Sequence, residues 1–428
     1  MVVVVGAQWG DVGKGKVVDI LSVNARVIVR FQGGNNAGHT LVVGGEKTIL
    51  HHIPSGVLHP DKLCAIGPGV VIDPEVLLSE IDALRARGFL KDPGALRISS
   101  NAHVIMPYHR ALDLAREQAR GKGKIGTTGR GIGPCYEDKM GRSGIRLNDL
   151  FEAKTLREKI DRALPEKNIL LSKLYGQEEM KSDEIAARHA AFGERLRPFA
   201  DDVSELIARE SKADHSILFE GAQGVLLDLD HGTYPFVTSS NTVAGGACTG
   251  AGVGPTRIDS VVGITKAYAT RVGSGPFPTE LDDVVGKRLQ ERGKEFGSTT
   301  GRARRCGWVD AVALRYAVRV SGIQGFVVNK LDVLSGINPV KIATAYRRDG
   351  DIVKEFPSTP RELAACDPVY EEMEGWSEDV RKARKMSELP AAARRYLDRI
   401  SELSETGILM VSVGPGREET IRIKNPFD

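Results

Sequence analysis

The 428-residue chain contains only five cysteines, and they show no pattern that would bind zinc or form a disulfide framework. They are odd in number, widely scattered and never spaced as Cys-x-x-Cys. This distribution argues against a disulfide-rich protein and favours a reducing compartment such as the cytoplasm.

Long apolar runs and a strong charge imbalance are also missing. No apolar stretch approaches the ~18 residues of a transmembrane helix, and no cationic segment leads into an apolar one near the N-terminus. Lys and Arg number 59 against 56 for Asp and Glu, which leaves a formal net charge of +3. We therefore expect a cytoplasmic protein whose partners include neither a membrane nor a nucleic acid.

Glycine, by contrast, is abundant. The chain has 48 glycines, about 11% of its residues against a usual ~7%, which predicts many loops with unusual backbone angles. The length allows about two or three domains or one elaborate α/β unit.

The N-terminal stretch is the most informative. Residues 2–5 are four valines, typical of a strand buried on both faces, and apolar residues within 17–21 follow with helical spacing. Between them lies a glycine-rich segment with lysines, which predicts phosphate binding at a helix N-terminus. The spacing is not that of a Walker A loop, because six residues separate Gly6 from Gly13 and Gly15 replaces the expected Ser or Thr.

This loop also carries Asp11. Phosphates repel a neighbouring carboxylate unless a cation bridges them or the carboxylate acts as a base. The N-terminal loop therefore indicates nucleotide chemistry with an acidic group built in.

Polar loops follow two further buried strands, as in the ligand crevice of α/β proteins. His39 in the first of these loops could be structural, but Gly38 beside it would let a ligand approach the backbone closely. The strands expected after the first are residues 25–31, 216–220 and 258–268, and the polar loops are 32–40 and 221–224.

Two loops combine glycine with basic and hydroxyl side chains. Residues 121–134 could be a linker, but their isoleucines, Lys, Thr and Arg favour binding of an anion or a nucleobase. Residues 296–305 place three arginines beside a Thr-Thr pair, which suits carboxylates or phosphates. A bare surface patch is the alternative, and the lack of interleaved aromatic residues argues against nucleic acid.

The sequence predicts a strand within residues 325–332 whose C-terminal end binds guanine. This segment finishes with Asn329-Lys330-Leu331-Asp332. A carboxylate placed there can accept both the N1 proton and the exocyclic amine of guanine, which adenine cannot offer. A last strand is expected at 408–412, before Gly414.

The remaining segments suggest packing rather than chemistry. Asp228-x-Asp230-His231 could bind a metal, but alternation along an extended segment places His231 opposite the carboxylates, so structural hydrogen bonding is favoured. Helices are expected at residues 74–87, 108–120 and 309–320 and across most of 149–212.

Six motifs, taken in order, resemble those of the adenylosuccinate synthetase family, and the similarity covers essentially the whole chain. They are residues 8–16 (QWGDVGKGK), 34–40 (GNNAGHT), 125–134 (IGTTGRGIGP), 219–224 (FEGAQG), 299–302 (TTGR) and 329–332 (NKLD). The resemblance implies an α/β fold with one large domain, residues 1–428, built on a mostly parallel central β-sheet (P-loop NTPase-like) with helical subdomains. It places a mainly helical excursion at about 100–212 and the guanine-pocket end at about 325–428.

The resemblance implies the reaction IMP + L-aspartate + GTP → adenylosuccinate + GDP + phosphate, the first committed step from IMP to AMP. It proceeds through 6-phosphoryl-IMP. One Mg²⁺ per subunit is the implied cofactor and GTP the co-substrate. The implied assembly is a cytoplasmic homodimer in which Arg142 reaches the neighbouring subunit's IMP.

Each matching residue carries an implied role. Asp11 is the base that takes the N1 proton of IMP, His39 is the acid beside the transferred phosphoryl group, and Asp11 and the Gly38 carbonyl hold Mg²⁺. The catalytic set is Asp11, Lys14, His39 and Gln223. The GTP contacts are Gly10, Gly13, Lys14, Gly15, Lys16, Gly38, Thr40, Arg304, Lys330, Leu331, Asp332, Ser412, Val413 and Gly414. The IMP contacts are Asp11, Lys14, Asn36, Ala37, His39, Thr128, Arg142, Gln223, Thr238 and Arg302. The aspartate contacts are Ser298, Thr299, Thr300, Arg302 and Arg304.

Two positions depart from the family pattern. Val12 stands where the family usually has Glu, next to the implied base, and Ala303 replaces an arginine common in the aspartate loop. We expect weaker catalysis from the first change and weaker aspartate binding from the second. A catalytically impaired homologue and a GTP-regulated binding module are the alternative functions.

Overall fold

A ten-stranded β-sheet forms the centre of the computed structural model, which describes residues 1–43, 46–297 and 301–428. The strand order is β20-β19-β15-β11-β1-β10-β2-β5-β7-β9, and every neighbouring pair is parallel except β19 and β20. The strands are β1 (Val2–Gly6), β2 (Val27–Arg30), β5 (Leu63–Ile66), β7 (Leu96–Ser99), β9 (Ala200–Asp201), β10 (Ile217–Glu220), β11 (Ser260–Lys266), β15 (Gly325–Asn329), β19 (Gly407–Ser412) and β20 (Thr420–Arg422). The predicted α/β fold with a mostly parallel sheet is confirmed.

Strand β1 lies in the middle of this sheet because its valines can be buried on both faces. Val3 and Val5 belong to a large apolar cluster on one face, while Val2 and Val4 join the cluster that covers helix α1 (Lys14–Ser22) on the other. This packing fixes the position of the loop between β1 and α1 at the carboxyl edge of the sheet.

The predicted strands at 25–31, 216–220, 258–268 and 325–329 are confirmed as β2, β10, β11 and β15. The segment 408–412 forms β19, but it is not the last strand, because the short antiparallel β20 follows and completes the edge. Strands β5, β7 and β9 were not predicted. They have at most four residues each, and unlike the equally short β2 and β10 they do not precede one of the predicted polar loops.

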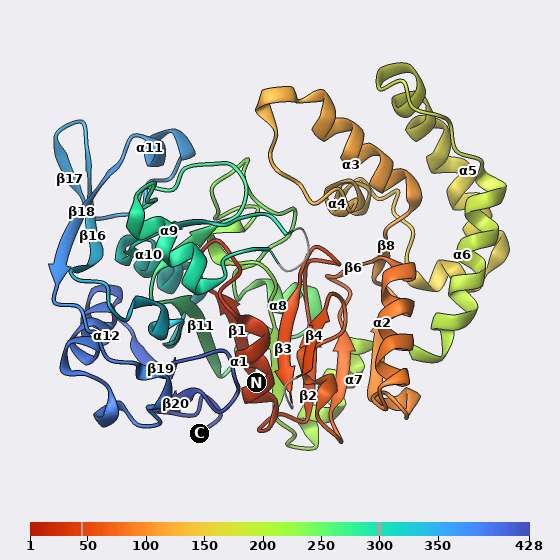
Figure 1. Cartoon of the computed structure of the whole chain (residues 1–428). Coiled ribbons are helices and arrows are strands. Elements are labelled where there is room, and N and C mark those ends of the chain that lie inside the picture. Colours follow the sequence, from red (N-terminus) through yellow and green to blue (C-terminus); the bar gives the residue numbers. More distant parts are fainter. Residues whose placement is uncertain (44–45, 298–300) are drawn as a thin grey trace.

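Helices cover the sheet and extend to one side of it. In Figure 1, α5 and α6 lie at one flank of the molecule and the small sheet of β16–β18 lies at the opposite flank. The predicted helices at 74–87, 108–120 and 309–320 correspond to α2, α3 and α10, and segment 149–212 contains α5, α6, the short strand β9 and α7. The helices after α1 are α2 (Pro74–Ala86), α3 (Pro107–Ala119), α4 (Ile132–Met140), α5 (Ala153–Ile169), α6 (Ser182–Leu196), α7 (Val203–Lys212), α8 (Gly246–Ala251), α9 (Val284–Gly293), α10 (Ala311–Ser321), α11 (Pro360–Ala364) and α12 (Ala391–Ser404).

The described residues also form four small sheets outside the central one. They are β3 (His39–Val43) with β4 (Glu46–Leu50), β6 (Val71–Ile72) with β8 (His103–Val104), β12 (Ala269–Arg271) with β13 (Arg305–Gly307), and β14 (Val309–Asp310) with β16 (Val340–Arg348), β17 (Asp351–Val353) and β18 (Asp367–Met373). None of the helices formed by the described residues combines the length and apolarity required to cross a membrane.

Candidate active site

A cavity of about 500 Å³ opens at the carboxyl ends of β1, β2, β10 and β15. Loops that follow these four strands supply much of its wall, as the crevice rule for parallel sheets predicts. The predicted site residues that line it are Gly10, Asp11, Gly13, Lys14, Gly15, Asn36, Ala37, Gly38, His39, Thr40, Thr128, Gln223, Thr238, Arg302, Arg304 and Lys330.

The loop after β1 turns sharply before helix α1. Gly13 has φ of 83° and caps the helix, and Asp11 has φ of 52°, a left-handed value that is uncommon for a residue with a side chain. Asn329 at the end of β15 donates from Nδ2 to the Val12 carbonyl oxygen over 2.6 Å and so ties this loop to the predicted guanine-binding strand.

The loop after β10 packs closely on the loop after β1. A Cβ at Gly224 would lie 2.2 Å from the Gln8 carbonyl oxygen, so a larger residue there would push the loops apart. Lys14 donates from Nζ to the Gln223 carbonyl oxygen. Burial lowers the pKa of Lys14 to about 8, although the charge of Asp11 opposes this shift. The Gln223 amide is buried with no hydrogen-bond partner among the described residues, so it is free to bind a ligand in the cavity.

His39 begins β3 and is held by a buried carboxylate. Its Nδ1 contacts Oε1 of Glu220 at the end of β10, and Ser55 donates to Glu220 from its backbone N–H (2.8 Å) and its hydroxyl (2.6 Å). Burial would raise the pKa of Glu220, but His39, Arg30 and Ser55 together lower it, so the carboxylate stays ionised. Burial lowers the pKa of His39, which favours a neutral imidazole whose Nδ1–H points to Glu220.

The two basic loops meet across the cavity. Arg302 donates to the Gly126 carbonyl oxygen (3.0 Å) and to the Thr127 carbonyl oxygen (3.2 Å), and Arg304 donates from Nε to Asp11 Oδ2 (2.9 Å). Arg302 and Arg304 of the predicted loop 296–305 therefore join the predicted loop 121–134 to Asp11. Three predicted aspartate contacts, Ser298, Thr299 and Thr300, lie outside the described residues.

A second group of predicted GTP contacts gathers beside the cavity, at the ends of β15 and β19. Lys16 donates from Nζ to Ser412 Oγ and to the Gly414 carbonyl oxygen, each over 2.7 Å. Burial lowers the pKa of Lys16 to about 8 and raises that of Asp332. This group forms a separate extension of the site, because its members are not among the described residues that line the cavity. They are Lys16, Leu331, Asp332, Ser412, Val413 and Gly414.

Arg142 is the predicted IMP contact that lies apart from the others. It is exposed just beyond the end of α4, and it is not one of the described residues that line the cavity of its own chain. Its predicted contact with a neighbouring subunit stays a prediction.

Several residues of the site could not be found from sequence patterns. Glu220, Lys266 and Glu295 are charged but fully or almost fully buried, and they hold His39 and Arg304 in place. The one available signal was a charged residue at the end of an apolar strand, as for Glu220 and Lys266.

The Asp228 segment is structural, as predicted. The Asp228 carboxylate accepts hydrogen bonds from four backbone N–H groups, those of Asp230, His231, Thr242 and Val243. No group of three or more His, Cys, Asp or Glu suited to a metal ion occurs among the described residues.

The cavity nevertheless fits a Mg²⁺ ion bound together with nucleotide phosphates. Mg²⁺ in such sites takes one or two carboxylates, with phosphates and water completing the octahedron. The Asp11 carboxylate is 37% exposed and lines the cavity together with Gly38. Asp11 and the Gly38 carbonyl are therefore the groups that would hold the ion.

Val12, the departure beside Asp11, is completely buried in the apolar cluster that includes Val2, Val4 and helix α1. We expect Val12→Glu to raise turnover, because a second carboxylate beside Asp11 adds negative charge next to the metal position. We expect it also to lower the free energy of unfolding by about 1 to 3 kcal/mol, because the apolar contacts of Val12 in this cluster are lost and a charge is held at its edge.

Steady-state kinetics and thermal unfolding of the two proteins measure both effects. Val12→Gln is the matched control, since it adds nearly the same volume without charge and should cost stability without a gain in turnover. Equal turnover of the parent chain and Val12→Glu would contradict this prediction.

The chain is similar over nearly its whole length to proteins of one known family. A family model described as "Adenylosuccinate synthetase" matches residues 3–421. The adenylosuccinate synthetases of Geobacter sp. (strain M21) and Anaeromyxobacter sp. (strain K) are 57% and 58% identical over 426 residues, which covers 100% of this chain and 99% of each relative. The solved structure of a fully ligated adenylosuccinate synthetase from Plasmodium falciparum matches with a TM-score of 0.93 at 36% identity, over 99% of both chains.

Proposed function

Because the chain belongs to the adenylosuccinate synthetase family of ligases, we propose that it joins IMP and L-aspartate at the expense of GTP. The products are adenylosuccinate, GDP and phosphate, and the intermediate is 6-phosphoryl-IMP. The observation that carries this proposal is that Asp11, in the loop after β1, and His39, at the start of β3, line the same cavity.

The chemistry needs a base on the purine and a proton donor on the phosphate. The O6 of hypoxanthine is a poor leaving group, and phosphorylation makes its displacement by the aspartate amine feasible. In our proposal Asp11 removes the N1 proton, so that O6 attacks the γ-phosphate of GTP. In our proposal the negative charge of the bound phosphates favours protonation of His39 at Nε2. This nitrogen then donates toward the transferred group, while Glu220 on Nδ1 supports the positive charge of the protonated ring.

Fixed positive charges supply most of the stabilisation in phosphoryl transfer. Lys14 and the backbone N–H groups at the start of α1 face the cavity, and Arg304 lies beside Asp11. Mg²⁺ held by Asp11 and the Gly38 carbonyl would neutralise charge that develops between the β- and γ-phosphates.

The same proposal assigns the three ligands to parts of the site. IMP occupies the region of Asn36, Thr128, Gln223 and Thr238, which all line the cavity, and Arg142 reaches it from the neighbouring subunit. L-Aspartate binds at loop 298–304, and guanine binds where Asp332 and Ser412 lie.

The remaining parts of the proposal concern the whole protein. The chain forms one domain over residues 1–428, with a mainly helical excursion at about 100–212, and it acts as a cytoplasmic homodimer completed by Arg142. All five cysteines are unpaired, which agrees with a reducing compartment.

Phosphate release from GTP tests the function directly. We expect the purified chain to release phosphate only when IMP, L-aspartate, GTP and Mg²⁺ are all present, with adenylosuccinate formed in equal amount. GTP hydrolysis that is indifferent to IMP would contradict the proposal and favour a GTP-regulated binding module. Binding of all three ligands without turnover would instead identify a catalytically impaired member of the family.

A further inference from the structure

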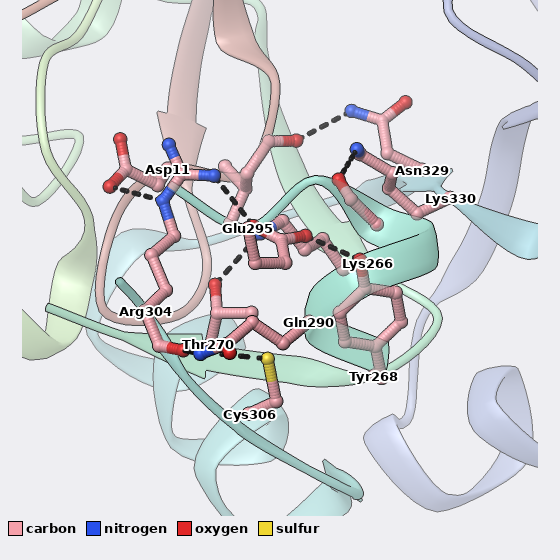
Figure 2. Close-up of polar contacts among 12 residues, drawn as sticks. Asp11, Lys266, Tyr268, Thr270, Gln290, Glu295, Arg304, Cys306, Asn329 and Lys330 are labelled. Atoms are coloured by element: carbon pink, nitrogen blue, oxygen red, sulfur yellow. Dashed lines mark hydrogen bonds and ion pairs between the residues drawn. The ribbon is translucent and has the colours of Figure 1, made fainter. Parts of the chain in front are cut away.

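A buried cluster of charged residues lies behind Arg304, on the side away from Asp11. Figure 2 shows Glu295 between Lys266 and Arg304, with the Arg304 side chain extending onward to Asp11. Glu295 is 0% exposed and Lys266 is 1% exposed. Neither residue belongs to the motifs that point to the proposed reaction.

Glu295 uses both carboxylate oxygens. Its Oε2 accepts from Lys266 Nζ over 2.7 Å and from Arg304 Nη1 over 2.6 Å, while its Oε1 accepts from the Tyr268 hydroxyl. Burial alone would raise the pKa of Glu295, but the charges of Lys266, Lys330 and Arg304 lower it to about 2. Glu295 is therefore ionised at neutral pH, and one negative charge is shared by two cations.

The backbone reinforces this arrangement. Arg304 N–H donates to the Glu295 carbonyl oxygen over 2.8 Å, and Gln290 of helix α9 donates to the Arg304 carbonyl oxygen over 2.9 Å. Lys330 donates from Nζ to the Gly293 carbonyl oxygen over 2.6 Å. The segment that carries Glu295 is thus anchored both to the loop of Arg304 and to the predicted guanine-binding strand end.

Arg304 needs such an anchor because a long guanidinium side chain has many rotamers of similar energy. Its side chain is only 11% exposed, and within the described part of the chain its guanidinium pairs with the carboxylates of Asp11 and Glu295. Glu295 is the more firmly held of these two carboxylates, because its side chain is completely buried, whereas the Asp11 side chain is 37% exposed. A fixed guanidinium binds a carboxylate or phosphate at a smaller entropic cost.

We propose that Glu295, braced by Lys266 and Tyr268, is a positioning residue that fixes Arg304 beside Asp11 for recognition of the L-aspartate carboxylate. This inference rests on the proposed function and adds to it a residue that does not contact the substrate.

The Glu295→Gln variant tests the inference. We expect its KM for L-aspartate to rise about tenfold, with the KM for IMP within about twofold of the parent value, because a charge-assisted hydrogen bond to Arg304 is lost. Glu280→Gln is the matched control. Glu280 forms an equivalent pair with the neighbouring Arg305 (2.5 Å from its Nε), so its loss should leave the KM for L-aspartate within about twofold.

A double-mutant cycle separates positioning from a general structural role. In an Arg304→Ala background, Glu295→Gln should change the KM for L-aspartate by less than about twofold, because its effect passes through the missing arginine. An undiminished tenfold effect in that background would overturn the inference. So would a parental KM in Glu295→Gln itself.

Two further measurements keep the test decisive. If Glu295→Gln does not fold, Tyr268→Phe removes only the hydroxyl bond to Glu295, and we expect about a threefold rise in the KM for L-aspartate. An unchanged KM in Tyr268→Phe would overturn the inference.

Calorimetric titration of L-aspartate in the presence of IMP and GDP does not require turnover. If binding weakens in Glu295→Gln while the parent chain shows no turnover, the proposed reaction fails and the positioning role stands.

Discussion

Asp11→Asn is expected to lower kcat for adenylosuccinate formation by about a thousandfold, the range typical of a lost general base. The amide has the size of the carboxylate but cannot take the N1 proton of IMP at neutral pH. The variant also loses the negative charge that pairs with Arg304 over 2.9 Å and that would hold Mg²⁺. Single-turnover kinetics with saturating IMP, GTP and L-aspartate measure the chemical step directly.

Asp11→Glu and a binding measurement accompany this variant. The glutamate keeps the charge but moves the carboxylate by one methylene, so it should recover metal-dependent GDP binding without full turnover. IMP binding by calorimetry shows that the cavity of Asp11→Asn is intact. Turnover above about a tenth of the parent value in Asp11→Asn would contradict the role of Asp11 as base.

His39→Asn is expected to lower kcat by about a hundredfold with a much smaller change in the KM for IMP. Asparagine can keep a hydrogen bond to Glu220, so the buried carboxylate is not left without a partner, but it cannot supply a proton to the phosphoryl group. The pH dependence of the parent kcat should show a group that is absent from the His39→Asn profile.

His215→Asn is the control for this prediction. His215 forms the same kind of pair, with Nδ1 placed 2.8 Å from Glu210 Oε2, but it is exposed and is not among the described residues that line the cavity. It should leave kcat unchanged. Parental turnover in His39→Asn would assign this histidine to structure rather than to proton transfer.

Sequence patterns located those parts of the site that follow a recognisable strand. Asp11, His39 and Lys330 each stand just after a buried apolar run, and parallel strands bring such positions to one edge. The loops 121–134 and 296–305 were found instead from their glycine, basic and hydroxyl residues, and the predicted strands at the centre of the sheet were confirmed. Strands β5 and β9 are no longer than the predicted β2 and β10, but neither precedes one of the predicted polar loops, so they were missed.

The side-chain contacts that orient the site could not be predicted from sequence patterns. Arg304 meets Asp11 across 293 positions of sequence, and His39 meets Glu220 across 181. Glu295 looks like an ordinary surface charge in the sequence, and Lys266 is marked only by its place at the end of an apolar strand. Their pairing could not be foreseen, because burial of a charged pair depends on packing from several distant elements. Such pairs have no local pattern, so only the folded chain reveals them.

The position of β10 has a consequence for how the protein is made. This strand lies between β1 and β2 and pairs with both, yet the ribosome reaches it only at Ile217. Until then the nascent chain lacks the strand that joins its first two, and long-range pairing of this kind slows folding. An emerging N-terminal half therefore carries both Asp11 and His39 without the element that sets their separation, and the site is assembled only when the second half of the chain is synthesised.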